Sequence, residues 1–235
     1  TTKEGISLRA QFKTMADAMD PNNPDSQIKM QQFMQSNIMN ESNRAAGRIG
    51  VGAVMGSKHL KAVVVRGTGA VRVSDNDAFR AAMEKASTKI KEHEVGGKGL
   101  RTYGTDVLVN ILNEIGGLPT RNFRESYFPE ADKVGGESLT ARLLTRPRGC
   151  YSCIISCGRA TRVKNPKYEG YGEGPEYETA WAFGPDCGID DLEAITKANY
   201  ICNEAGIDTI TMGTTIACAM DLFENNIITA KDTDG

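Results

Sequence analysis

Three cysteines lie close together in the second half of the chain. Cys150, Cys153 and Cys157 form a C-x2-C-x3-C pattern, and such short spacings let one tight turn direct several sulfur atoms toward a common centre. A cubane iron–sulfur cluster takes four cysteine ligands, and a structural zinc ion also needs four ligands. The two histidines, His59 and His93, are remote from the pattern, so the fourth ligand is missing from it. The spacing favours an iron–sulfur cluster over zinc, and zinc over free thiols.

Two glutamates flank a tyrosine in the segment 173–179. Glu176 and Glu178 stand two residues apart, on either side of Tyr177. Burial raises the pKa of a carboxyl group, and a partly buried carboxylate pair beside a phenol can transfer protons in a reaction. An acidic turn without a catalytic role is the alternative interpretation.

A glycine-rich, positively charged segment covers residues 44–58. Glycine has no Cβ atom, so the backbone there can approach a ligand closely. Backbone N–H groups next to cationic side chains suit the oxygens of a phosphate. The glycine spacing matches neither the P-loop nor the dinucleotide-binding fingerprint. The segment is therefore a candidate phosphate-binding loop, with a tight turn before a strand as the alternative.

A predicted joint of helix, glycine and helix spans residues 203–209. Asp208 follows Gly206 and precedes the second helix, and an aspartate in that place is usually an N-cap. The functional alternative is a loop that offers polar groups to a heterocyclic ligand.

Helices are expected to position most of these residues, because apolar residues recur at intervals of three or four after capping residues. Before them, the β-branched run Leu60–Arg66 predicts a strand. We expect a mainly α chain with a β-rich N-terminal part, an α+β fold with a domain boundary near residue 72. The predicted helices run from a Ser74 cap through Ile90, from a Thr105 cap through Ile115, over 137–145, from Asp190 or Asp191 to Ala205, and from Ile210 to Glu224.

Composition restricts the class of protein. The chain has 28 basic and 30 acidic residues, a balance that gives no support for a broad nucleic-acid-binding surface. It has no apolar run of the ~18 residues that a membrane-spanning helix needs, and its N-terminus lacks the apolar region of a secretory signal. The absent initiator methionine and the abrupt end at Gly235 predict a piece of a larger protein. Cys187, Cys202 and Cys218 are expected to be buried small apolar residues.

Taken together, these segments resemble the tungsten-dependent aldehyde:ferredoxin oxidoreductase family. The glycine-rich segment, Leu118–Phe123, the three cysteines, Gly174–Thr179 and the joint at 203–210 follow the family's order over nearly all of residues 44–235. Residues 1–43 match no part of the family and are expected to be an insertion. The resemblance implies an internal fragment. Residues 1–72 would end a β-rich, pterin-cradling domain, and residues 73–235 would form a helical domain that binds an iron–sulfur cluster and pterin.

The resemblance also implies an activity and its cofactors. Family members oxidise an aldehyde to a carboxylic acid with water at a bis-pterin tungsten centre, and electrons leave through a 4Fe–4S cluster to ferredoxin. By this likeness the three cysteines ligate the cluster. Glu178 beside Tyr177 would be the active-site carboxylate, with Glu176 as the second candidate. The pterin-binding residues would be Gly47, Arg48, Gly50, Val51, Gly52, Asn203, Ile207 and Asp208.

Some properties stay open under this likeness. Molybdenum can take the place of tungsten, Mg²⁺ can join the pterin phosphates, and another electron-carrier subunit can replace ferredoxin. The family implies a cytoplasmic enzyme that is a homo-oligomer or part of a complex. One alternative is a tungsten subunit that reduces the aromatic ring of an acyl-coenzyme A, and another is a non-enzymatic zinc-binding module. Asn203 stands where the family commonly has Asp, and Lys197 argues against an iron at the dimer interface.

Overall fold

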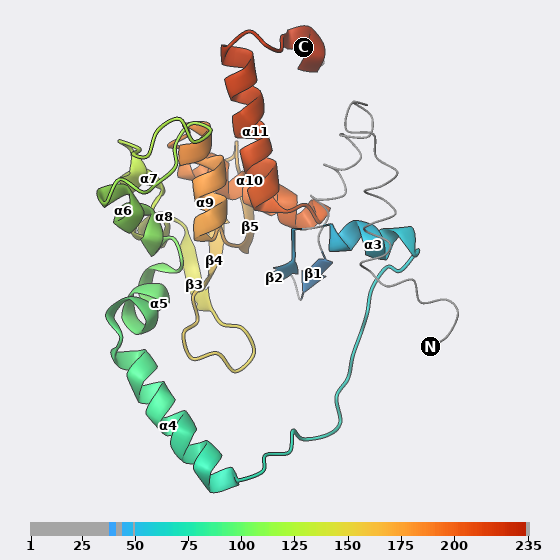
Figure 1. The fold of residues 1–235 in the computed structure, drawn as a ribbon, viewed down its shortest axis with the longest axis vertical. Coiled ribbons are helices and arrows are strands. Elements are labelled where there is room, and N and C mark those ends of the chain that lie inside the picture. Colours follow the sequence, from blue (N-terminus) through green and yellow to red (C-terminus); the bar gives the residue numbers. More distant parts are fainter. Residues whose placement is uncertain (1–37, 41–43, 49, 234–235) are drawn as a thin grey trace.

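The computed structural model describes residues 38–40, 44–48 and 50–233. The predictions for residues 1–37 fall outside this range. A helical body surrounds a small sheet, and α4 (Asn76–Glu92) extends away from that body (Figure 1). The prediction of a mainly α chain of the α+β class is confirmed, and the structure shows that its sheets are small. Within the described range, no helix combines the length and the apolar character needed to cross a membrane.

The helical body encloses one main hydrophobic core. Val109, Leu118, Trp181 and Ile195 are buried in it, and they come from segments on both sides of the cysteine motif. The elements of this body and its C-terminal extension are η1 (Glu94–Gly99), α5 (Leu100–Tyr103), α6 (Val107–Glu114), α7 (Ala131–Val134), α8 (Gly136–Arg142), α9 (Tyr177–Phe183), η2 (Pro185–Cys187), α10 (Leu192–Ala205), α11 (Thr209–Glu224) and η3 (Ala230–Thr233).

A three-stranded antiparallel sheet in the order β3-β4-β5 positions the candidate functional segments, which are the cysteine loop and the acidic turn. Its strands are β3 (Leu144–Arg148), β4 (Gly158–Val163) and β5 (Gly170–Glu173). The cysteine loop joins β3 to β4, and β5 leads into the turn before α9. The predicted helix over 137–145 is wrong at its C-terminal end, because the chain leaves α8 after Arg142 and pairs with β4.

Local capping sets the ends of the long helices. The Asp191 carboxylate accepts hydrogen bonds from two N–H groups in the first turn of α10, and Gly206 ends that helix in the left-handed conformation. Both predictions are therefore confirmed. Asp75, not Ser74, caps α4, one residue later than predicted.

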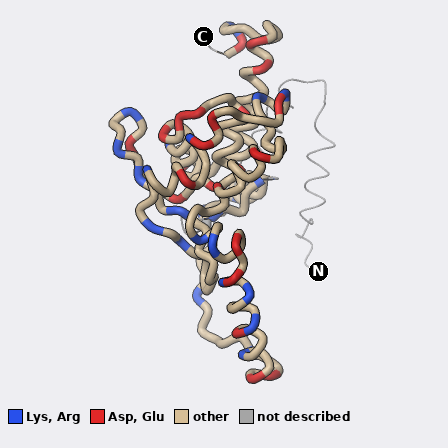
Figure 2. Tube along the Cα trace, turned by 90° about the vertical axis from the view of Figure 1, so that its left-hand side faces the viewer, with Lys and Arg blue, Asp and Glu red and all other residues tan. Residues whose placement is uncertain are grey.

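The N-terminal part has few regular elements within the described residues. β1 (Ile38–Asn40) pairs antiparallel with β2 (Arg44–Ala46), and α3 covers Val51–Ser57. The predicted strand over Leu60–Arg66 is wrong. No described strand pairs with that segment, and the Val64 side chain is 92% exposed. The helix after it, α4, has no buried residue, and both basic and acidic residues lie along it (Figure 2).

Candidate active site and metal centre

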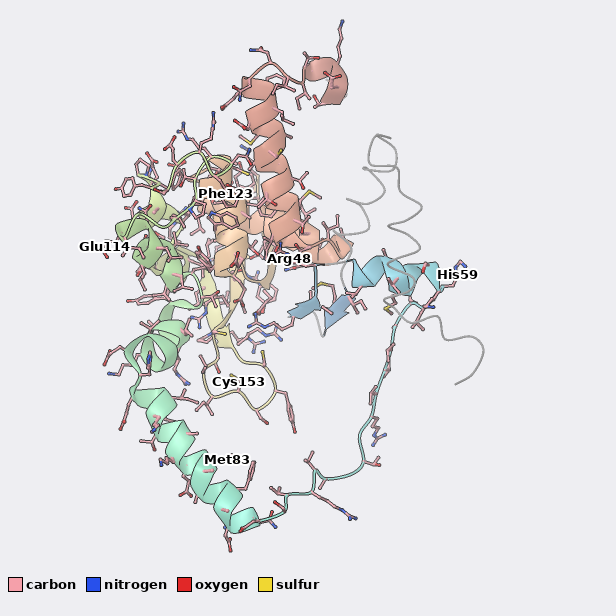
Figure 3. The ribbon with its side chains drawn as sticks, in the orientation of Figure 1. Arg48, His59, Met83, Glu114, Phe123 and Cys153 are labelled. Atoms are coloured by element: carbon pink, nitrogen blue, oxygen red, sulfur yellow. The ribbon has the colours of Figure 1, made fainter. Side chains whose placement is uncertain are left out.

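The three cysteines lie on the loop between β3 and β4. Cys150 and Cys153 are exposed and Cys157 is half-buried; Figure 3 shows Cys153 on this loop. The Cys153 N–H donates to the Cys150 carbonyl at 3.0 Å, which closes a tight turn. Hydrogen bonds from the backbone of Ile155 and Ser156 lower the pKa of the Cys153 thiol. The backbone therefore favours the thiolate, the form that binds metals.

Arg44 connects this loop to the acidic segment. Its guanidinium forms an ion pair with Glu176 and donates to Cys157 Sγ at 3.8 Å. Burial opposes the charge on Arg44, but Glu176 and Cys150 together hold the pKa of Arg44 above its usual range. Sequence reasoning counted Arg44 only among the positive charges of its segment. The structure makes it the residue that links a carboxylate to the cysteines.

Glu176 is the better placed of the two glutamates. It is half-buried and accepts a hydrogen bond from Thr105 Oγ1 at 2.8 Å. The same hydroxyl accepts the Tyr177 N–H at 2.9 Å. Thr105 was predicted to cap a helix, but it does not, because its hydroxyl is used here and α6 begins after Asp106. Glu178 is exposed on the first turn of α9.

Tyr177 lies half-buried beside these groups. Burial, with a smaller contribution from Glu178, raises the pKa of Tyr177 to about 12. The phenol therefore stays protonated at neutral pH, so it can donate a hydrogen bond.

Glu173, at the end of β5, is a buried carboxylate that sequence reasoning did not select. Its Oε2 accepts no hydrogen bond in the described part of the chain. The Arg148 Nε lies 3.8 Å from this oxygen. Burial raises the pKa of Glu173, and Arg44 opposes that shift. A Cβ atom at Gly158 would collide with the Glu173 carboxylate, so the glycine next to Cys157 makes room for this acid.

The predicted joint after α10 lies next to Glu173. The Asn203 amide donates to the Glu173 carbonyl at 3.3 Å. Both residues line a cavity of about 270 Å³ together with Tyr200. Asp208 caps α11 by accepting the Thr211 N–H at 2.8 Å, so the structural interpretation of Asp208 is confirmed. The half-buried Ile207 lies between them.

The glycine-rich segment differs from the predicted loop. Gly50 has a φ of 73° and begins α3, so Val51 and Gly52 lie in a helix instead of a loop. Arg48 is exposed and also has a positive φ, 38°. Gly47 precedes it, and none of these residues forms a described hydrogen bond with the cysteine loop.

The donor set at the cysteine loop fits a thiolate-bound metal group in its chemistry. Three thiols share one loop, with a guanidinium and backbone N–H donors near them. In the described ranges, however, no three His, Cys, Asp or Glu side chains are grouped closely enough to hold a metal ion. The residue types expected from the sequence are thus present, and their side chains are not gathered around one centre.

The remaining cysteines lie elsewhere. Cys187 and Cys202 are buried, as predicted, and burial raises the pKa of Cys187 to about 12 and that of Cys202 to about 11. Cys218 is exposed on α11, so that prediction is wrong.

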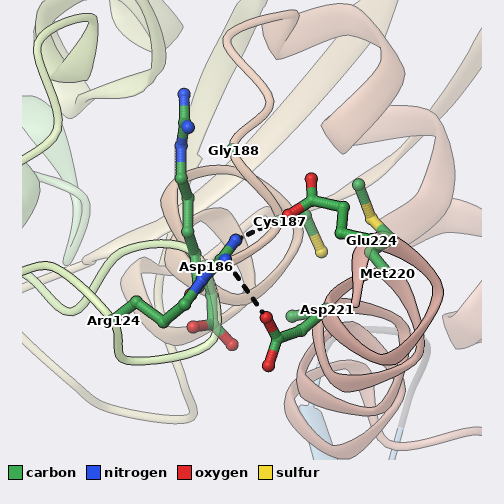
Figure 4. A pocket seen from close by; sticks show the side chains of 9 residues that line it. Arg124, Asp186, Cys187, Gly188, Met220, Asp221 and Glu224 are labelled. Atoms are coloured by element: carbon green, nitrogen blue, oxygen red, sulfur yellow. Dashed lines mark hydrogen bonds and ion pairs between the residues drawn. The ribbon is translucent and has the colours of Figure 1, made fainter. Parts of the chain in front are cut away.

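A second pocket, of about 210 Å³, lies beside the predicted turn at 118–123 (Figure 4). Arg124 lines this pocket and pairs with Asp221 at 3.3 Å and Glu224 at 2.8 Å. Asp186 is buried behind it. Burial raises the pKa of Asp186, although backbone N–H groups of Phe123 and Asn122 oppose this. Arg124, Asp221 and Glu224 pair with one another, whereas neither oxygen of the buried Asp186 carboxylate accepts a hydrogen bond in the described part of the chain.

Comparison with known proteins defines the family. The model of the aldehyde ferredoxin oxidoreductase N-terminal domain matches residues 30–67, and the model of domains 2 and 3 of the same family matches residues 81–235. The chain belongs to the aldehyde ferredoxin oxidoreductase family. This confirms the resemblance seen in the sequence. The expected insertion over residues 1–43 is wrong for residues 30–43, because the N-terminal-domain model matches them.

Relatives in the family share much of the sequence. The tungsten-containing aldehyde ferredoxin oxidoreductase of Thermococcus kodakarensis is 48% identical over 82% of this chain, and that of Pyrococcus furiosus is 47% identical over 81%. The aliphatic sulfonate oxidoreductase WOR-like subunit of Pyrococcus furiosus is 28% identical. The chain spans about a third of the length of these relatives, 31% in each case.

A solved structure shares the fold. The active-site complex BamBC of benzoyl coenzyme A reductase superposes with a TM-score of 0.67 at 21% identity, over 88% of this chain and 33% of that one. The match supports an aldehyde ferredoxin oxidoreductase-like architecture for the described elements.

Proposed function

We propose that the chain forms the cluster-binding and pterin-binding part of a tungsten oxidoreductase that converts aldehydes to carboxylic acids with water. Electrons would leave through a 4Fe–4S cluster to ferredoxin or another electron-carrier subunit. The observation that supports this most is the position of Arg44, which contacts both Cys157 and Glu176. It places a candidate acid–base group next to a candidate electron carrier.

Cys150, Cys153 and Cys157 would hold three corners of the cluster. A cluster with a thiolate shell is anionic, and Arg44 offsets this charge from inside the site. The fourth ligand would come from outside this sequence. When bound, the cluster and the tungsten pterin would supply the redox chemistry, which no side chain here can perform.

Glu176 is the carboxylate that we propose for proton handling near tungsten, in preference to Glu178. Thr105 and Arg44 fix both of its oxygens, so it can orient water or substrate. Tyr177 would donate a hydrogen bond beside it. Glu178 is exposed and forms no described side-chain hydrogen bond, which argues against the role that the family resemblance implied for it.

The pterin would contact two regions of the chain. One is the joint with Asn203, Ile207 and Asp208, beside the cavity next to β5. The other is the segment with Gly47, Arg48, Gly50, Val51 and Gly52, whose backbone and charge suit the pterin phosphates and an accompanying Mg²⁺. Molybdenum is the alternative metal. We further propose a cytoplasmic enzyme that acts as a homo-oligomer or within a complex.

Replacing one cysteine tests the cluster. We expect Cys153→Ser in the full-length protein to lower its iron content and abolish the visible absorbance of the cluster. Cys218→Ser, another exposed cysteine on a distant helix, should change neither. Equal iron content in the two variants would contradict the proposed cluster. Metal analysis of the parent protein also separates tungsten with iron from zinc alone, the signature of a zinc module.

A pair of glutamate variants tests the acid–base assignment. We expect Glu176→Gln to lower kcat by about 100-fold or more, the usual size of an acid–base contribution, while tungsten content is unchanged. Glu178→Gln should keep kcat within a factor of about 3, because small surface changes have small effects. The reverse ranking would restore Glu178 to the mechanism. Turnover of an aromatic acyl-coenzyme A in place of aldehydes would instead favour the ring-reducing alternative.

A further inference from the structure

Arg159, the second residue of β4, is a buried arginine. Its side chain is 1% exposed, and within the part of the chain that the structure describes its guanidinium donates only to backbone carbonyls. Nε reaches the Cys157 carbonyl at 3.1 Å, and Nη2 reaches the Ser156 carbonyl at 2.9 Å. Two bonds thus hold the final residues of the cysteine loop, including the third cysteine.

The same guanidinium holds the end of α5. Nη1 donates to the Thr102 carbonyl at 2.9 Å, and Nη2 donates to the Arg101 carbonyl at 2.9 Å and approaches the Leu100 carbonyl at 3.4 Å. The last carbonyls of a helix have no partner within it, so one cation caps α5 and ties it to the loop. A second bond joins α5 to the cysteine loop, because Arg101 donates to the Ile154 carbonyl at 3.2 Å.

The backbone packed against Arg159 has no room for an additional side-chain atom at Gly104. Gly104, with a φ of +72°, lies directly against it, and a Cβ atom there would come within 3.1 Å of the Arg159 side chain and within 3.0 Å of the Cys157 carbonyl. Only a glycine fits this position without strain.

The charge of Arg159 has no direct counterion. Among the described residues it forms no ion pair, and the buried Asp106 nearby forms no side-chain hydrogen bond. Burial lowers the pKa of Arg159, and Cys157 is the main group that opposes this. The carboxylates of Asp106, Glu176 and Glu173 also act on this cation, but none forms an ion pair with it among the described residues. Its Nε lies 3.1 Å from the Cys157 carbonyl, so the charge acts at short range on the third cysteine.

We propose that Arg159 is a positioning residue for the iron–sulfur cluster: it fixes the backbone that carries Cys157 and places a permanent positive charge behind that ligand. The proposal rests on the proposed function, because it requires a cluster at the cysteine loop. It predicts two separable effects, one on cluster retention through the hydrogen bonds and one on the reduction potential through the charge.

Two substitutions separate the effects in the full-length, anaerobically prepared protein. Arg159→Met removes both charge and hydrogen bonds, while Arg159→Lys keeps the charge and loses the planar fork of donors. Arg162→Met is the matched control, because Arg162 lies on the same strand but is exposed. The measurements are the rate of iron loss to a chelator, the midpoint potential from a redox titration followed by electron paramagnetic resonance, and circular dichroism.

We expect Arg159→Met to lose iron about 10-fold to 100-fold faster than the parent, the range seen when residues that orient metal ligands are removed, and to have a more negative midpoint potential. Arg159→Lys should lose iron faster but keep a potential near that of the parent. The control should match the parent in both. Rates and potentials unchanged in both Arg159 variants would overturn the proposal.

Folding failures are also informative. If Arg159→Met does not fold, Arg159→Lys decides, since parent-like iron retention in that variant would overturn the positioning role. Unfolding of both variants would make Arg159 a purely structural residue and would overturn the proposal as well. A parent protein without iron at this loop would instead contradict the proposed function, before the variants are compared.

Discussion

Several buried ionisable groups lie in the region of β4 and β5 that follows the third cysteine. Glu173 and Asp106 are carboxyl groups with oxygens that accept no hydrogen bond in the described structure. Arg159 is buried near them without a direct ion pair. Burying a charge without partners costs free energy. Each group is therefore expected either to have a shifted pKa or to be stabilised by its neighbours. Such concentrations of perturbed groups are typical of functional sites.

Asp106 gives a prediction about pH and stability. Burial raises the pKa of Asp106 well above its usual value, Glu176 and Glu137 add to this, and Arg159 opposes it. As pH rises above about 3.9, the ordinary pKa of aspartate, the unfolded chain releases this proton while the folded chain keeps it. The parent therefore loses stability as pH rises toward the raised pKa. Asp106→Asn should have a melting temperature advantage over the parent that grows from acidic to neutral pH.

Asp190→Asn is the control of opposite sign. Lys133 lowers the pKa of Asp190 through a 2.5 Å hydrogen bond. The stability that this carboxylate adds to the folded state is therefore present at neutral pH and lost as the pH falls. Its variant should fall behind the parent most clearly at neutral pH. A pH-independent effect of Asp106→Asn would show that its carboxyl group is already neutralised by other means.

Residue spacing along the chain predicted only part of the site. The cysteines were found because all three lie within one loop, and Asp208 was found because caps act over a few residues. Arg44 was not selected, since its partner Glu176 is 132 residues away. The family resemblance implied Glu178 before Glu176, and the sequence alone does not show that the turn before α9 half-buries Glu176 and exposes Glu178.

At the scale of elements, β5 and α10 are joined through one tyrosine. The Tyr200 ring lies against β5, where Cβ atoms at Gly170 and Gly172 would come within 2.7 Å of it. Its hydroxyl lies 2.7 Å from Thr161 Oγ1, and that threonine donates to the Gly174 carbonyl. This chain of contacts holds the turn that carries Glu176.

The close packing of Tyr200 predicts the effect of a single methyl group. Gly172→Ala should lower the free energy of unfolding by about 1–3 kcal/mol, the usual cost of overpacking, because neither the strand nor the buried ring can move freely. Urea unfolding of the full-length protein measures this. Gly56→Ala is the matched control, because nothing lies within 4 Å of the added atom, and it should not lower the free energy of unfolding. Equal effects would mean that the ring can move aside.

Helices were easier to predict than strands for a physical reason. The caps and apolar spacing of α10 and α11 are local, and their predicted ends agree with the structure to within a residue or two. The strands β3, β4 and β5 were not predicted, because their pairing depends on segments on either side of the cysteine loop. The same dependence explains Leu60–Arg66, a β-branched run without a described partner strand.

At the scale of the whole molecule, an exposed segment separates α3 from α4. All residues from 61 to 80 are exposed, and the side chains of Val64 and Val65 are 92% and 84% exposed. Exposed apolar side chains in a row mark a surface that is covered in the working protein. The domain boundary predicted near residue 72 lies within this segment and stays a prediction.

Limited proteolysis tests this view. We expect trypsin to cut the isolated 235-residue chain first after Lys61, Arg66 or Arg72, because exposed extended backbone fits a protease most easily. In the full-length protein, which by its relatives would be about three times as long, these sites should be cut more slowly. Equal rates at these sites in both proteins would show that nothing covers the segment.

The contact between Arg44 and Glu176 has a consequence for biosynthesis. The ribosome adds about 5–20 residues per second, so the 132 residues between the two partners take roughly 7 to 26 s to emerge. During that interval Arg44 has emerged and its partner Glu176 has not yet been made. A cofactor that relies on both side chains can be inserted only after α9 has left the exit tunnel, so maturation of this centre follows translation of its acidic turn.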